Sequence, residues 1–220
     1  MPAAHSQPLP EYDAWRVDLG HPVMRGARSR AEVMVQAAAL ICATGVGYQH
    51  MGRGPDLFDE IGLVRACVQA AVDWAAAAAG AHEGILAQPQ PISDLAGYGA
   101  EQARYDPTPF EGLVLAWGLR LVATAADTNL QKAAQPGDVF LCTGRGPALG
   151  VVVSPWRETA AYPHYEAPAV AAVHTPNPPR IVRRSVMNHM PVALYRFADE
   201  AVALVPTPAK AAGLRALREA

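Results

Sequence analysis

The sequence predicts an α+β fold, in which helices come first and a mostly antiparallel sheet follows. Helical signals dominate residues 29–126, beginning with a capping sequence at residues 29–32 and an apolar, alanine-rich run over residues 61–79. From Val139 onward, short runs rich in β-branched residues alternate with Pro, Gly and Asn. Helices followed by about five strands favour segregated layers over a βαβ arrangement.

Composition narrows the function classes. The chain has 220 residues, of which 51% are hydrophobic and 17% are charged, which suits one sizeable domain with a real core. A net charge of −2 gives no electrostatic case for nucleic acid or an anionic membrane. We find no signal-peptide pattern, and Gln69 and Asp73 interrupt the apolar run that comes nearest to a membrane span.

The first 28 residues are predicted to form an irregular, proline-rich arm. Its candidate anchors are Tyr12, Trp15 and Val17. Docking of this arm on a neighbouring chain and folding back onto its own domain are equally compatible with the sequence. Ser29 and Glu32 form a capping box that opens a helix running to about Thr44.

A glycine-rich loop separates this helix from the next one. Gly45 and Gly47 are expected to end the first helix in left-handed conformations, and Asp56 or Asp59 to cap the second. The second helix is apolar around most of its circumference, apart from one narrow stripe formed by Arg65, Gln69 and Asp73. Such a helix is normally buried inside a domain.

In the second half of the chain, the spacing of the apolar residues changes from that of helices to that of strands. Residues 80–107 are interpreted as loop or broken helix, and a second capping box at residues 108–111 starts a helix to about Ala126. Strands are predicted over residues 139–142, 149–153, 170–175, 181–186 and 192–197. A short helix is expected from Thr207. The resulting organisation is an arm (1–28), a domain (29–200) and a C-terminal segment (201–220).

One set of residues carries a family resemblance. Tyr48, Phe58, Asp59 and the run GLVR at residues 62–65 resemble the signature of the NlpC-type, papain-fold cell-wall peptidases, in the branch encoded among tail genes of phages and gene-transfer agents. The segment PGDVFL resembles the family's P-G-D before its first central strand, and VALYRF resembles the closing strand of the phage-tail branch. The resemblance extends over residues 31–197 and implies a papain-like fold.

The resemblance also implies where the chemistry would lie. In that family a cysteine follows the aspartate, and the helix N-terminus stabilises its thiolate. Glu60 occupies that position here, and a carboxylate cannot replace a thiolate in this chemistry. Ala148 stands at the position of the histidine base, and His174 falls at the position that orients the base. Tyr48 and Asp59 are retained.

Other readings of the reactive residues are weaker. Cys42, Cys67 and Cys142 are interpreted as small buried residues, because an odd number without a C-x-x-C motif predicts neither disulfides nor zinc. The histidines are too loosely spaced for a metal site, the pair Asp59–Glu60 is interpreted as a helix cap, and the arginines as a solvated face. The histidines concerned are His164, His174 and His189, and the arginines are Arg180, Arg183 and Arg184.

The sequence therefore leads us to expect a catalytically inactive NlpC-like homologue, without cofactor or metal, that acts as a structural part of a phage or phage-like tail tip or baseplate. The expected partners are other tail-tip or hub proteins, with the host cell wall as a further candidate. Assembly would take place in the bacterial cytoplasm. The alternative is an active murein peptidase or amidase with an unrecognised nucleophile.

Overall fold

The computed structural model describes residues 16–44, 46–54, 56–83, 92, 94, 98–126, 130–143, 149–154, 157–159, 162–166, 168–173, 180–185 and 190–198. Its helices are η1 Pro22–Met24, α2 Arg30–Ala43, α3 Glu60–Glu83, α4 Ala100–Tyr105, α5 Thr108–Ala116 and α6 Leu130–Ala133. Its strands are β1 Gly47–Tyr48, β2 Leu57–Phe58, β3 Leu119–Thr124, β4 Val139–Thr143, β5 Leu149–Val152, β6 Arg157–Thr159, β7 Tyr162–Glu166, β8 Pro168–Val173, β9 Arg180–Ser185 and β10 Met190–Phe197.

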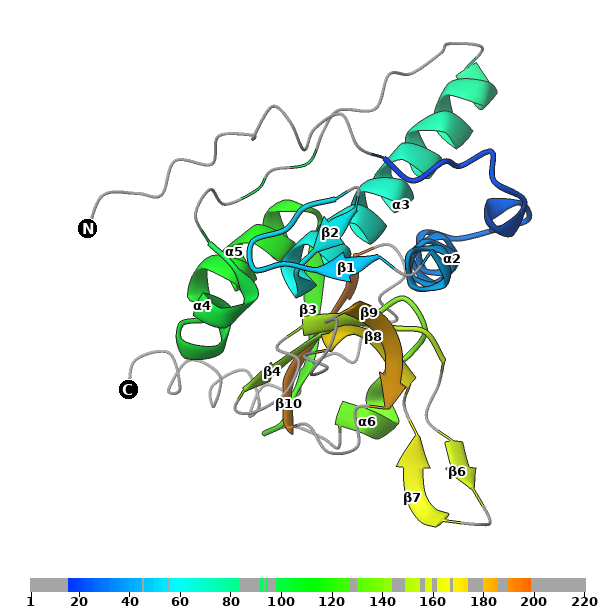
Figure 1. The fold of residues 1–220 in the computed structure, drawn as a ribbon. Coiled ribbons are helices and arrows are strands. Elements are labelled where there is room, and N and C mark those ends of the chain that lie inside the picture. Colours follow the sequence, from blue (N-terminus) through cyan, green and yellow to red (C-terminus); the bar gives the residue numbers. More distant parts are fainter. Residues whose placement is uncertain are drawn as a thin grey trace, which may run out of the picture.

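The main sheet confirms the predicted α+β class (Figure 1). Its strand order is β2-β1-β9-β8-β5-β4-β10-β3, and every neighbouring pair is antiparallel except β1 with β2. The five predicted strands lie side by side as β9, β8, β5, β4 and β10. The sheet is nevertheless wider than the five strands expected, because β3 extends one edge and β1 and β2 extend the other.

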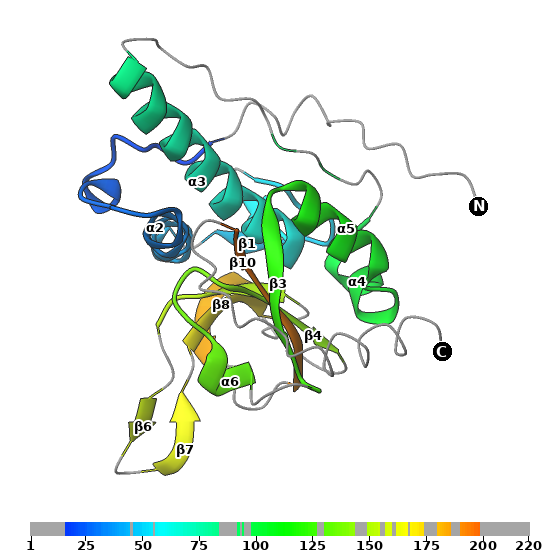
Figure 2. The same ribbon diagram turned by 180° about the vertical axis from the view of Figure 1, so that it is seen from behind.

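Alternate side chains of the central strands enter two separate cores. Val139 and Leu141 of β4 pack into the larger core with helices α2, α3 and α5, whereas Phe140 and Cys142 pack into a smaller core with α6. This follows from the two-residue period of a strand. Figures 1 and 2 show the same layering, with the larger helices on one side of the sheet and α6 on the other.

The β6–β7 hairpin forms a second, two-stranded sheet of its own. In both views it projects away from the main sheet on the side opposite α3. No pattern in the sequence predicts these two strands. They are short, of three and five residues, and give little periodicity to detect.

The predicted first helix is confirmed as α2. Ser29 Oγ accepts a hydrogen bond from Glu32 N at 3.1 Å, and the Glu32 carboxylate accepts one from Arg28 N. Thr44 forms the C-cap in a right-handed helical conformation. The prediction that Gly47 ends this helix in a left-handed conformation is wrong, since Gly47 belongs to β1 and its φ is not positive. Gly45 lies outside the described residues.

The predicted helix over residues 108–126 is wrong in its second half. Helix α5 ends at Ala116, Trp117 is its C-cap, and Gly118 follows with a φ of 90°. That left-handed residue stops the helix, and the next six residues form β3 on the edge of the sheet beside β10. Pairing with β10 therefore takes the place of the helix that this apolar run predicted.

The second capping box is also not formed as predicted. Thr108 is a residue of α5 itself, and its backbone N–H donates to Asp106 Oδ1 at 3.2 Å. The Glu111 carboxylate accepts a hydrogen bond from the Tyr195 hydroxyl at 3.0 Å. Glu111 thus links α5 to β10, two elements that meet in the larger core.

The described part of the N-terminal arm packs on its own domain. Val17 is only 7% exposed and Met24 only 4%, and both belong to the larger core. Arg16 Nη1 donates to both carboxylate oxygens of Asp73, at 2.7 and 2.8 Å. Of the two alternatives left open by the sequence, Val17 therefore follows the second, folding back onto its own domain. Tyr12 and Trp15 lie outside the described residues, as does the helix expected from Thr207.

Helix α3 has the length and apolar composition of a membrane span over Glu60–Ala79, but 67% of the most apolar window is buried within the protein. Helix α3 contacts α2, β2, β5 and β8. We therefore describe it as the core helix of the domain, in agreement with the prediction from its apolar circumference.

Candidate functional site

The start of α3 is the candidate functional site. Glu60 is the first residue of the helix and is 1% exposed, so it lies where the sequence predicted it, at the first turn of a buried helix. Asp59 precedes it and is the cap: its Oδ1 accepts the N–H of Gly62 at 2.7 Å. Of the two candidate caps, the structure selects Asp59.

The loop before α3 lies tightly against the helix start. Asp59 N donates to Gly52 O at 3.0 Å, and a Cβ atom on Gly62 would come within 2.2 Å of that same oxygen. Only glycine permits this approach. Met51 in this loop has a φ of 61°, and its N–H donates to Asp59 Oδ2 at 3.1 Å. The loop and the helix cap thus form one hydrogen-bonded unit.

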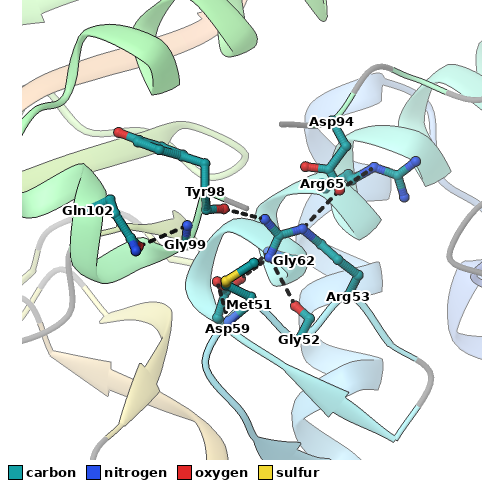
Figure 3. A network of polar contacts seen from close by, with 10 residues as sticks. All are labelled: Met51, Gly52, Arg53, Asp59, Gly62, Arg65, Asp94, Tyr98, Gly99 and Gln102. Carbon is teal, nitrogen blue, oxygen red and sulfur yellow. Dashed lines mark hydrogen bonds and ion pairs between the residues drawn. The ribbon is translucent and has the colours of Figure 1, made fainter. Parts of the chain in front are cut away.

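Arg53 occupies the centre of this unit, as Figure 3 shows. Its guanidinium donates to Asp59 Oδ1 at 2.7 Å, to Asp94 Oδ2 at 2.9 Å and to Tyr98 O at 2.7 Å, and it also reaches Gly52 O. Arg53 is 3% exposed. One side chain therefore joins the loop, the cap of α3 and a segment about forty residues further along the chain.

Two arginines and two aspartates meet in this buried cluster. Arg65 Nε lies 3.5 Å from Asp94 Oδ2, so two guanidinium groups face two carboxylates, those of Asp59 and Asp94. Burial alone would lower the pKa of Arg53, but the carboxylates of Asp59 and Asp94 outweigh it and the pKa is raised. With its pKa raised, the Arg53 guanidinium stays charged at neutral pH and holds this ion network together.

The polar stripe of α3 is buried and paired. Arg65 Nη2 donates to Ile92 O at 3.1 Å, and Ile92 N donates to Gln69 Oε1 at 2.7 Å. Gln69 Nε2 in turn donates to Asp73 Oδ1 at 2.7 Å. The polar residues at this four-residue spacing therefore attach other parts of the chain to α3.

Burial decides what Glu60 can do. With 1% of its surface exposed, its carboxylate cannot be reached by a bulky substrate such as a peptide. Tyr48, the retained neighbour of the family's nucleophile, is half-buried in β1 and packs against the larger core. Asp59 is fully committed to the cap and to Arg53. These residues therefore have structural roles, and the start of α3 is closed to a peptide substrate.

Two of the three cysteines, Cys67 and Cys142, lack the environment of a nucleophile. Cys67 is fully buried, and burial, with a smaller contribution from Cys42, raises the pKa of its thiol. Burial raises the pKa of Cys142 to about 12. Cys42 is half-buried in α2. A thiol-based nucleophile needs a lowered pKa and an accessible sulfur, and Cys67 and Cys142 have neither.

Two of the predicted positions, Ala148 and His174, lie outside the described residues. Their neighbours Leu149 and Val173 begin β5 and end β8, which pair antiparallel through Gly150 and Ala171. The side chains of His164 and His189, and of Arg180, Arg183 and Arg184, also lie outside the described part. Among the described residues no group of three His, Cys, Asp or Glu side chains could hold a metal ion.

Comparisons with protein-family models, curated proteins and solved structures find no match to this chain.

Arg53 and Asp94 are the site residues that the sequence analysis missed. They are 41 positions apart, and no local pattern links them. The only available signal was a charged residue within a glycine-rich loop next to a predicted helix cap. An isolated arginine in such a loop normally faces solvent, so the sequence favours the wrong environment.

Proposed function

We propose that this chain is a catalytically inactive relative of the NlpC-type peptidases that serves as a structural subunit of a phage or phage-like tail tip. A papain-like arrangement is supported by the contact of core helix α3 with β5 and β8, two of the antiparallel strands that follow it. In the resemblance, the helix supplies the nucleophile and these strands supply the base and its orienting residue.

The observation that carries the proposal is the buried carboxylate of Glu60 at the start of α3. A helix start of this kind would lower the pKa of a thiol, but a carboxylate there serves only as an electrostatically favourable end group. The Arg53 network then holds the loop against it. Retaining a rigid fold after losing its chemistry is consistent with a docking role, because fold and site are separable.

The role in a tail rests on the resemblance to the phage and gene-transfer-agent branch. We propose tail-tip or hub proteins as the partners, and assembly in the bacterial cytoplasm before incorporation into the particle. The test is detection of the chain by mass spectrometry in tails purified from producing cells. Its absence from purified tails would contradict the structural role.

We predict no thiol-dependent hydrolysis of a murein stem peptide. Iodoacetamide at pH 8 is expected to leave Cys67 and Cys142 unmodified in the native protein, because both thiols are buried and their raised pKa values keep them protonated. Both should react after unfolding in urea, which serves as the control. Peptide turnover that iodoacetamide abolishes would instead establish the alternative, an active peptidase or amidase.

A further inference from the structure

The domain carries a cleft whose lining includes none of the residues of the Arg53 network. Its volume is about 570 Å³, within the range of pockets that accommodate small ligands. Residues 16–21 form one wall, the last turn of α2 with Thr44 forms the other, and Gly47 and Asp56 close one end. No part of the proposed function uses this cleft.

The floor of the cleft is aliphatic. Val17 and Ile41 are buried members of the larger core, and Leu40 and Val46 are half-buried beside them. Such a floor favours an apolar side chain over a polar one, because a polar group placed there would lose its hydrogen bonds to water.

The rim of the cleft carries uncompensated negative charge. Asp18 and Asp56 are both exposed, and among the residues that the structure describes no cation pairs with either carboxylate. Arg16 also lines the cleft, but Asp73 neutralises it through two short hydrogen bonds. The rim is therefore complementary to a basic group.

The walls are also held in place without a ligand. Arg16 fixes one wall to α3, and Asp18 Oδ1 accepts the N–H of Gly20 at 2.8 Å, which orients its carboxylate. His21 Nδ1 accepts the N–H of Val23 at 3.2 Å and thereby fixes its ring. A cleft formed in advance loses less entropy when it binds.

We infer that this cleft binds a segment of a partner subunit in which a Lys or Arg side chain lies next to aliphatic residues. The aliphatic side chains would occupy the floor, and the cation would lie between Asp18 and Asp56. The inference rests on the proposed function for the source of the segment, a neighbouring tail protein. The chemistry of the segment follows from the cleft alone.

The first experiment titrates the labelled full-length protein with the synthetic peptide acetyl-AVLKVLKA-amide. Methyl NMR should report shifts at Val17, Leu40, Ile41 and Val46. The Asp18→Asn, Asp56→Asn double variant should bind about tenfold more weakly at low salt, since each exposed ion pair contributes little. Asn keeps the Oδ1 that accepts from Gly20 N, so the wall should remain intact.

Glu32→Gln is the matched control. It removes a carboxylate from the opposite end of α2, and its amide oxygen can still accept the N–H of Arg28. This variant should bind the peptide as the wild type does, and the peptide with Glu in place of Lys should not bind. Absence of binding, shifts outside the cleft, or equal affinity for the double variant would each overturn the inference.

The second experiment separates this inference from the proposed function. Tails are purified from cells that produce either the wild type or the Asp18→Asn, Asp56→Asn variant. Incorporation of the wild type but not of the variant supports both. Equal incorporation of the two overturns the cleft as the docking site, whereas absence of the wild type from tails contradicts the structural role itself.

Discussion

Arg53 connects more of this molecule than its place in a glycine-rich loop suggests. Its guanidinium meets two carboxylates and two backbone carbonyls, and it is almost completely buried. A planar group with fixed donors suits this task better than a lysine, which offers a single point charge. Removing it would leave Asp59 and Asp94 buried with a large part of their compensation lost.

We predict that Arg53→Met lowers the free energy of unfolding by about 3–5 kcal/mol, because breaking one side of a buried ion network strands the other. Urea denaturation followed by circular dichroism measures this loss. Arg120→Met is the control: Arg120 is exposed on β3 and donates to the carbonyls of Leu115 and Leu119, so its replacement should change stability by no more than about 1 kcal/mol.

Equal stabilities of the two variants would show that the network adds nothing to the fold. If Arg53→Met does not fold, Arg53→Lys provides the measurement instead. Lysine keeps the charge but cannot reproduce the four directed contacts, so an intermediate loss is expected.

At the scale of elements, the boundary between α5 and β3 depends on Gly118. It has a φ of 90°, and a Cβ atom there would meet nothing within 4 Å. The cost of a side chain at this position is therefore conformational and not steric crowding. Gly112, inside α5, has the same open surroundings without a positive φ. The two glycines form a matched pair.

We predict that Gly118→Ala destabilises the protein by about 1–2 kcal/mol, since an L-residue is strained in the left-handed region. Gly112→Ala should stabilise it by about 0.5–1 kcal/mol, because alanine loses less entropy in a helix. Thermal unfolding midpoints of both variants provide the comparison. A shift in the same direction for both would refute the assignment of Gly118 as the helix stop.

Elements with a strong local pattern could be predicted from the sequence. Helix α2 carries its own cap, α3 carries fifteen apolar residues over residues 61–79, and five strands stand between Pro, Gly and Asn. Strand β3 could not be predicted from the sequence, because its residues continue an apolar run and only Gly118 marks the change from helix to strand. Strands β1 and β2 have two residues each, too few for any period.

The candidate site was less accessible to prediction. The position of Glu60 at a buried helix start followed from the helix pattern and the resemblance. The residues that pair with α3 and with its cap could not be predicted. In the sequence, 41 positions separate Arg53 from Asp94 and 57 separate Arg16 from Asp73. Ion pairs between residues so far apart in the sequence are set by the fold, and local sequence propensity does not indicate them.

At the scale of the whole molecule, residues 16–28 belong with the domain. We predict that deleting residues 1–28 lowers the free energy of unfolding by roughly 3–6 kcal/mol, because it removes two core side chains, Val17 and Met24, and the partner of Asp73. Urea denaturation of the isolated truncated chain is the measurement.

The double variant Val17→Ala, Met24→Ala in the full-length chain tests the same point without truncation. It should lose stability in the same direction, by the cost of two cavities. A truncated chain as stable as the full-length protein would show that the arm contributes nothing to its own domain. If that chain also entered tails normally, a role for the arm in assembly would be refuted too.

The position of β10 in the sheet has a consequence for how the protein is made. Strand β10 lies between β4 and β3, so Leu119–Thr124 emerges from the ribosome well before the strand it pairs with. At roughly 5–20 residues per second, that delay lasts seconds. Strand β1 likewise waits for β9. During this interval the nascent chain presents unpaired strand edges, and β3 gains its partner only once β10, the last strand of the described part, has been synthesised.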